Sequence, residues 1–126
     1  MELKFFRCRH CGNVVVKFVD SGVSLFCCGS PMDTLSPATE DEGMEKHLPM
    51  LTRIDDRTLE VQVGSTPHPM TVQHSIQFIS LETEKGIQTL WLNPGDAPKA
   101  IFYCASRPVA VYEYCNIHGL WKTIVK

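Results

Sequence analysis

The sequence has no run of lysine or arginine, and its 12 basic and 14 acidic residues leave a formal net charge of -2. Proteins that bind nucleic acid neutralise phosphates with a basic surface, so we expect no nucleic-acid partner. The opening MELKFF has no apolar core of a secretory signal, and no apolar span approaches the ~20 residues that cross a bilayer. We therefore expect a cytoplasmic protein with no membrane partner.

Helical spacing is also missing, and no internal repeat or low-complexity tract is present. From Leu51 onward the chain contains short alternating or apolar runs instead. Leu59, Val61 and Val63 share one face of such a run, which is the period of a half-buried strand. Runs of this kind, separated by turn sequences, occupy 57–64, 74–83, 86–92, 100–106, 109–115 and 120–126. We predict an all-β fold, an antiparallel β-sandwich or barrel.

A polar, acidic segment, SPATEDEGMEK, separates this region from a short N-terminal part and is typical of a linker. We place the domain boundary between residues 36 and 37, which gives domains 1–36 and 37–126. The first domain has only two small apolar runs and buries too little to fold alone. Metal binding is expected to supply the missing stability. A second subunit can buttress so small a unit, and we expect a homodimer.

Six cysteines in a reducing compartment indicate metal ligands or buried thiols rather than disulfides. Four of them form two local pairs, Cys8-x2-Cys11 and the adjacent Cys27-Cys28. Four thiolates suit a tetrahedral site for zinc or iron. A structural zinc ribbon is the simplest interpretation, but it normally repeats the C-x2-C spacing. Adjacent cysteines reach one metal only with local strain, so the spacing leaves zinc and iron both open.

A second cluster of potential ligands lies in the β region. Cys115 and His118 are three positions apart, His47 follows the linker, and His68 and His74 lie in TPHPMTVQHSI. Prolines on both sides of His68 restrict its backbone and favour a fixed imidazole. A single histidine is usually an ordinary surface or core residue. Four histidines with one cysteine exceed what tetrahedral zinc needs, which favours iron.

Two further residues with ligand chemistry are not assigned to either cluster. His10 lies between Cys8 and Cys11 and is expected to face solvent. Cys104 alternates with strand residues and is predicted to be a buried thiol.

Formal charge distinguishes the two clusters. A ferrous ion with four thiolates keeps two negative charges and is closed to further ligands, so it can only store or pass an electron. A ferrous ion with four neutral imidazoles and one thiolate keeps one positive charge and an open octahedral position for a small anion. A thiolate opposite that position pushes electron density onto the metal, as in cysteine-ligated haem. The second cluster is therefore the predicted reaction site.

Two other classes of protein fit part of this pattern. A blue-copper electron carrier also combines a β-sandwich with cysteine and histidine, but it needs a weak axial ligand, commonly methionine. No methionine follows His118. A zinc protein with an interaction role would hold zinc at both clusters, and it predicts a colourless sample without redox response.

The order and spacing of nine potential ligands resemble desulfoferrodoxin, the two-iron form of superoxide reductase, over nearly the whole chain. The segments CRHCGNVVV and CCG are similar to its desulforedoxin domain, and EKHLP, PHPM, HSIQFI and YCNIHGLWK to its catalytic domain. The resemblance implies an immunoglobulin-like β-sandwich after the metal knuckle, and two iron ions. The first would be bound by Cys8, Cys11, Cys27 and Cys28. The second would have His47, His68, His74 and His118 in a plane and Cys115 as axial ligand.

The activity that the resemblance implies is the reduction of superoxide to hydrogen peroxide, without release of oxygen, in oxidative-stress defence. Superoxide is the implied substrate, and a rubredoxin the implied electron donor. Glu45 and Lys46 match a family glutamate that binds the oxidised iron and a family lysine that attracts superoxide. Without the adjacent histidine, this pair would be interpreted as an exposed part of the linker. The residues do not decide whether the four-cysteine iron relays electrons to the second iron.

Overall fold

The chain divides into two units, Met1–Ser36 and Pro37–Lys126. The computed structural model describes residues 3–41 and 46–126. The described residues form strands and loops and contain no helix, which confirms the all-β prediction. Consequently, no helix of a length and hydropathy able to cross a bilayer occurs in these two ranges.

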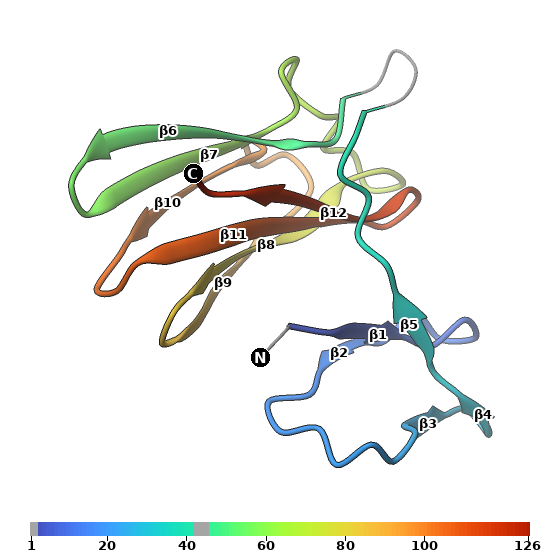
Figure 1. Ribbon diagram of the computed structural model, residues 1–126. Coiled ribbons are helices and arrows are strands. Elements are labelled where there is room, and N and C mark those ends of the chain that lie inside the picture. Colours follow the sequence, from blue (N-terminus) through green and yellow to red (C-terminus); the bar gives the residue numbers. More distant parts are fainter. Residues whose placement is uncertain (1–2, 42–45) are drawn as a thin grey trace. The chain divides into compact units, whose positions relative to one another are not determined.

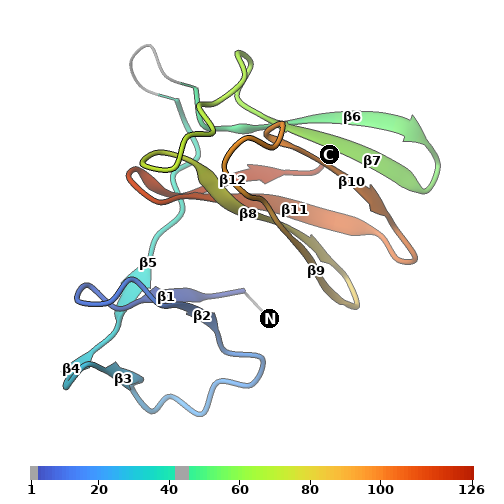
Figure 2. The same ribbon diagram turned by 180° about the vertical axis from the view of Figure 1, so that it is seen from behind.

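The second unit contains two antiparallel sheets that lie as two layers (Figures 1 and 2). In the first sheet, β7 lies between β10 and β6, and in the second the order is β12-β11-β8-β9. The strands are β6 (Pro49–Asp55), β7 (Thr58–Val63), β8 (Ile76–Thr83), β9 (Gly86–Trp91), β10 (Lys99–Tyr103), β11 (Pro108–Cys115) and β12 (Gly119–Ile124). Leu59, Val61 and Val63 are at most 2% exposed, as their alternation predicts. Each such side chain contributes about 1.5–3 kcal/mol on burial, so the core between the sheets stabilises this unit.

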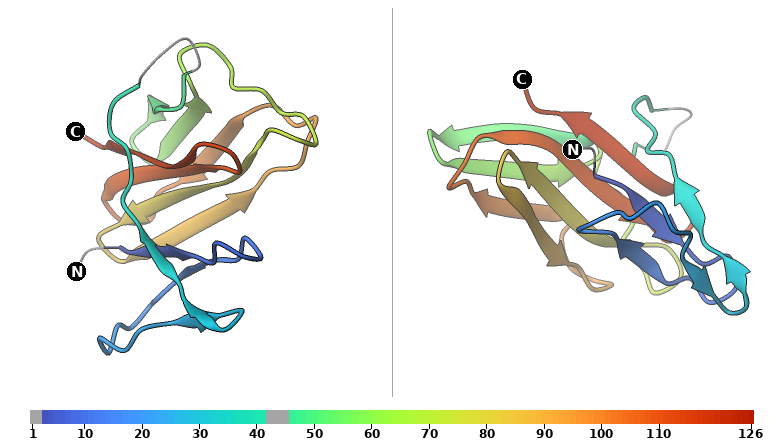
Figure 3. Two further views of the ribbon diagram at one scale, coloured as in Figure 1. Left: turned by 90° about the vertical axis from the view of Figure 1, so that its right-hand side faces the viewer. Right: turned by 60° about the horizontal axis from the view of Figure 1, so that its bottom comes forward.

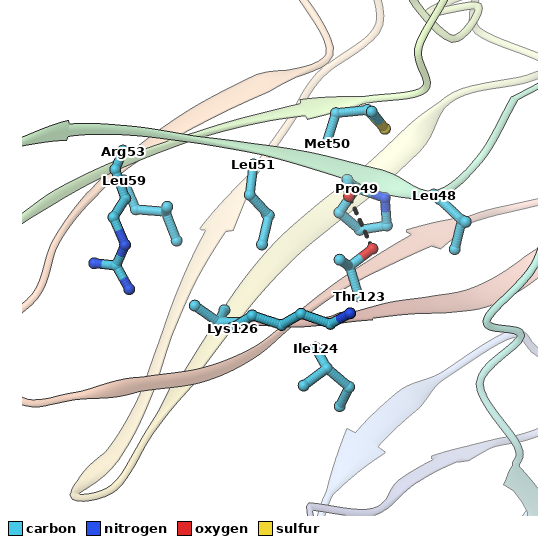
Figure 4. Close-up of a pocket in the computed structure, with 10 residues that line it drawn as sticks. Leu48, Pro49, Met50, Leu51, Arg53, Leu59, Thr123, Ile124 and Lys126 are labelled. Carbon is cyan, nitrogen blue, oxygen red and sulfur yellow. Dashed lines mark hydrogen bonds between the residues drawn. The ribbon is translucent and has the colours of Figure 1, made fainter.

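The strand β6 is the one element of the sandwich that the sequence pattern does not predict. It is an edge strand that pairs only with β7, and most of its side chains are exposed, so it lacks the alternation of a half-buried strand. It begins with Pro49, a residue that sheets tolerate at a strand start. Thr123 of β12 donates a hydrogen bond to the Pro49 carbonyl at 2.8 Å (Figure 4). A groove of about 420 Å³ lies along these two edge strands (Figure 4).

The first unit consists of very short strands, which can be followed in Figure 3. β1 (Phe5–Arg7) lies between β2 (Val14–Val16) and β5 (Asp33–Leu35), and β3 (Phe26–Cys27) pairs with β4 (Ser30–Pro31). Its buried hydrophobic side chains are Phe5, Phe6 and Cys8 among the described residues. Phe18, Val19, Val23 and Phe26, by contrast, are 67% to 86% exposed. The unit therefore has little hydrophobic stabilisation of its own.

Candidate metal centres

The four N-terminal cysteines are brought together by two tight turns. After β1, the Gly12 amide donates to the Cys8 carbonyl at 2.9 Å, and the Cys8 amide donates to the Asn13 carbonyl at 2.9 Å. The second turn follows β3, where Cys28 has a φ of 51°. No other non-glycine residue in the described part of the chain has a positive φ. This left-handed backbone is the strain that the adjacent pair predicts.

The sulfur positions fit a tetrahedral metal site. The four Sγ atoms all lie within 4.8 Å of one another. Metal–sulfur bonds of about 2.3 Å at tetrahedral angles place neighbouring sulfurs about 3.8 Å apart. The Cys11 and Cys27 sulfurs are 3.6 Å apart, and the Cys27 and Cys28 sulfurs 4.0 Å. These two distances lie on either side of the expected value, so the group is of the size that one tetrahedral ion requires.

The electrostatics of this group also favour a cation. The backbone amide of Cys11 lowers the pKa of the Cys8 thiol to about 6. The neighbouring sulfurs of Cys11 and Cys8 raise the pKa of Cys28 to about 12, and raise that of Cys27 as well. Like charges this close do not ionise together at neutral pH. A metal ion supplies the positive charge that four thiolates at these positions require.

The second candidate centre lies at one end of the β-sandwich. His47 precedes β6, His68 follows β7, and His74 precedes β8. Cys115 is the last residue of β11, and His118 lies in the turn to β12. Because β6 and β7, β8 and β11, and β11 and β12 pair antiparallel, the start of one strand lies beside the end of the other. Three segments that are distant in sequence, namely the one before β6, the β7–β8 loop and the β11–β12 turn, therefore meet at this end (Figure 1).

The four histidine rings form a closed cycle. Neighbouring ring centroids are 4.8 Å apart for His47 and His68, 4.7 Å for His68 and His74, 5.1 Å for His74 and His118, and 4.8 Å for His118 and His47. Nitrogens bound at about 2.1 Å place the centroids about 4.6 Å apart in a square and about 5.3 Å apart in a tetrahedron. Three of the four distances are closer to the square value. The centroid distances are thus compatible with a square of imidazoles, although His74 is not in the group of ligand atoms that lie within 4.8 Å of one another.

Cys115 lies close to this cycle. Its sulfur belongs to the group of ligand atoms, with those of His47, His68 and His118, that lie within 4.8 Å of one another. Cys115 is fully buried, whereas His118 is exposed and His74 half-buried. The His118 amide donates to the Cys115 sulfur at 3.4 Å, and His118 Nδ1 lies 3.8 Å from the same atom. The tight turn therefore presents the sulfur and one imidazole from a single loop.

Outer contacts orient two of the imidazoles. His68 Nδ1 lies 2.7 Å from the Pro69 carbonyl, and His47 Nδ1 lies 3.8 Å from Oε2 of Glu113. A ring nitrogen that faces an acceptor carries the proton, and the other nitrogen is then available to a metal. At 2.7 Å the His68 contact is a hydrogen bond, so Nε2 of His68 is the nitrogen left available to a metal, whereas the 3.8 Å separation at His47 is too long to fix which of its nitrogens carries the proton.

Glu113 and Trp121 also lie at this centre, although the sequence motifs assign a role to neither. Glu113 is fully buried, and its carboxylate lies beside His47. Trp121 stacks on the His47 ring at 4.5 Å and donates a hydrogen bond to the His118 carbonyl at 3.2 Å. A signal for Glu113 was present, because a charged residue in the apolar run VAVYEYC shares a strand face with Cys115.

Asn116 joins the two loops that carry the later ligands. Its side-chain oxygen accepts from the Ser75 amide at 3.0 Å, and its side-chain nitrogen donates to the Gln73 carbonyl at 2.9 Å. Its own amide donates to the Ser75 carbonyl at 3.2 Å. These three bonds fix the loop with His74 against the turn with Cys115 and His118.

The other residues singled out in the sequence lie in different environments. Lys46 is half-buried and directly precedes His47, whereas Glu45 lies outside the described residues. His10 is exposed, as predicted. Cys104 is half-buried rather than buried, because it lies one residue beyond β10, and it packs against the core outside both metal groups. Burial raises the pKa of the Cys104 thiol.

Comparisons with known proteins place both centres in one family. The Desulfoferrodoxin family model matches residues 39–124, and the model of the Desulfoferrodoxin N-terminal domain matches residues 1–35. A desulfoferrodoxin of Syntrophotalea carbinolica is 40% identical over 97% of this chain and 96% of its own length. A superoxide reductase of Thermococcus kodakarensis is 32% identical over 64% of this chain and 86% of its own. The crystal structure of the superoxide reductase from Treponema pallidum matches with a TM-score of 0.83 and 31% identity, over 97% of this chain and 98% of that one.

Proposed function

Because this chain belongs to the desulfoferrodoxin family, we propose that it reduces superoxide to hydrogen peroxide at its histidine–cysteine iron centre. The observation that carries this proposal is the cycle of four imidazoles close to a buried cysteine. Desulfoferrodoxins have two iron sites, and the two ligand groups are consistent with two irons. Relatives and solved structures that carry the name superoxide reductase support the activity.

In this proposal, the residues that would hold the iron are His47, His68, His74, His118 and Cys115. A ferrous ion held there would supply one electron and a position open to a small anion. Superoxide, one electron and two protons give hydrogen peroxide, so no oxygen is released. Cys8, Cys11, Cys27 and Cys28 hold the second iron. We further propose a rubredoxin-type electron donor, a binding role for Glu45 on the oxidised iron, and a part in oxidative-stress defence.

Anaerobic purification without added metal, followed by elemental analysis and superoxide kinetics, tests the proposal. We expect two irons per chain, rapid loss of superoxide, and one hydrogen peroxide for each superoxide consumed. Oxygen at half the superoxide consumed would indicate dismutation and contradict the proposal. Zinc in both sites would support the interaction protein, and copper in the second site the electron carrier.

The ammonium group of Lys46 is expected to attract superoxide to the centre. A single charge ~6 Å from the anion contributes about 3 kcal/mol at an effective dielectric constant of 20, before salt screening. We expect Lys46→Ala to slow the second-order capture of superoxide about tenfold at low salt and to weaken its dependence on ionic strength. Pulse radiolysis at several salt concentrations measures both quantities.

Lys99→Ala is the matched control for Lys46→Ala, because the Lys99 side chain is 49% exposed on β10 and lies 4.0 Å from the Glu60 carboxylate. It removes the same charge from a strand that provides no ligand of the centre. Equal rates at every ionic strength for the parent and Lys46→Ala would exclude electrostatic attraction by this residue.

We also propose that the protein is a homodimer in solution. The first unit exposes the four large apolar side chains Phe18, Val19, Val23 and Phe26, and such exposure is typical of a contact surface. Light scattering gives the molar mass directly, and a value near the monomer mass of 14.2 kDa would exclude the dimer.

A further inference from the structure

Residues outside the ligand set hold the backbone of Lys46, His47 and Leu48 from two sides. On one side, Oδ1 of Asp41 accepts hydrogen bonds from the His47 amide at 2.7 Å and from the Leu48 amide at 3.1 Å. On the other side, the Gly64 amide donates to the Leu48 carbonyl at 3.1 Å. One carboxylate oxygen and one glycine thus fix the peptide groups on both sides of a ligand histidine.

Gly64 has no room for a side chain. Its φ is +83°, and a Cβ there would lie 2.6 Å from the Lys46 carbonyl oxygen and 2.4 Å from the Thr66 carbonyl oxygen. Both are backbone atoms, so neither can move aside without displacing its chain segment. Gly64 also begins the loop to His68, whose amide donates to the Val63 carbonyl at 3.2 Å. The segments before His47 and before His68 therefore touch at this one glycine.

We propose that Asp41 and Gly64 are positioning residues for the histidine–cysteine centre, because they set the placement of His47 and Lys46 relative to His68. The ring of His47 is already restricted by its stack on Trp121 and by its approach to Glu113. The Asp41 hydrogen bonds fix the backbone end of the same residue. A ligand restricted at both ends loses little freedom on metal binding, and affinity improves accordingly. The inference rests on the proposed function only for the role of Lys46.

The experiment compares iron retention and amide exchange in the full-length iron-loaded protein. A ferrous chelator is added to the parent protein and to three variants, Asp41→Ala, Asp41→Asn and Gly64→Ala. Hydrogen exchange at the His47 and Leu48 amides is followed in the same four proteins. We expect Asp41→Ala and Gly64→Ala to lose iron from the histidine–cysteine centre at least about tenfold faster, while the four-cysteine iron stays bound. We expect exchange at both amides to accelerate in Asp41→Ala by a similar factor.

Three comparisons make the result specific. Gly95→Ala imposes a side chain at a φ of +92° where nothing lies within 4 Å, so it isolates backbone strain from the clash. Asp56→Ala removes an exposed carboxylate of the β6–β7 turn. We expect parental iron retention in both. Asp41→Asn keeps an acceptor oxygen of the same reach, and we expect it to restore amide protection and most of the iron retention.

Parental iron retention and amide exchange in both Asp41→Ala and Gly64→Ala would overturn the proposal. If Gly64→Ala fails to fold, the comparison of Asp41→Asn with Asp41→Ala tests the proposal. Equal losses of iron retention and amide protection in these two variants would overturn the role of the Asp41 hydrogen bonds. Neither measurement depends on turnover. Loss of the proposed superoxide activity in the parent protein would thus leave this test intact, and failure of this test would leave the activity unaffected.

Discussion

Replacing Cys115 with serine is expected to abolish the rapid reduction of superoxide, with a fall in the second-order rate of at least about 100-fold. The thiolate of Cys115 would add negative charge to the iron and make transfer of an electron to superoxide easier. A neutral hydroxyl is a harder and weaker donor. The His118 amide, which lies 3.4 Å from the Cys115 sulfur, would also lose its acceptor geometry.

Stopped-flow or pulse-radiolysis kinetics measure this effect, and the absorption of the oxidised iron reports the loss of the thiolate ligand. The matched control is Cys104→Ser, because Cys104 is half-buried and lies outside both metal groups. We expect Cys104→Ser to retain the parental rate and spectrum. A full rate in Cys115→Ser with iron bound would remove Cys115 from the proposed mechanism.

The parts of this protein that the sequence predicts are those in which chemistry or periodicity is local. Alternation in β7 predicts its buried face, and the Cys-x2-Cys and Cys-Cys pairs predict one four-sulfur group. The strain of the adjacent pair is also local, and it is observed at Cys28. The histidines are different, since they lie on three segments that are distant in sequence. Ligand chemistry groups them with Cys115, but their placement in one plane follows only from the family resemblance.

The remaining parts depend on contacts between distant segments. Asp41 is an ordinary acidic linker residue in the sequence, and only the fold shows that it accepts two hydrogen bonds from the segment with His47. Gly64 is one of 8 glycines, and its role depends on the approach of the Lys46 carbonyl. The edge strand β6 has no alternating pattern because most of its side chains, on both faces, are exposed. Sequence patterns over a few neighbouring residues do not show which distant segments come into contact.

Removal of the metal from the four-cysteine group is expected to unfold residues 3–36 and to leave the β-sandwich folded. Strands of two or three residues and three buried hydrophobic side chains do not offset the conformational entropy of ordering this unit. Binding of structural zinc contributes about 10–16 kcal/mol to the folding of small metal-binding peptides at neutral pH. Loss of the metal therefore removes a large part of the free energy that folds a unit of this size. The strained backbone at Cys28 adds to the deficit.

Cys8→Ser removes a buried ligand and tests this expectation without a chelator. We expect one iron fewer per chain, collapse of the amide NMR signals of the first unit into the range of an unfolded chain, and unchanged dispersed signals from the sandwich. Cys104→Ser again serves as the control and is expected to keep both irons. Dispersed signals from residues 3–36 in metal-free protein would show that the small core suffices.

The same unit is expected to lose its metal and its fold as the pH falls. Metal-bound sulfurs carry no protons, whereas in the metal-free group Cys28, with a pKa raised to about 12, and Cys27 hold theirs at neutral pH. Protons therefore bind the metal-free state preferentially, so each pH unit of acidification weakens metal binding by about tenfold for every proton taken up. A titration of the first-unit NMR signals at constant metal concentration measures this slope. A pH-independent midpoint between pH 5 and 8 would mean that metal binding displaces no protons, against the thiolate assignment of the four cysteines.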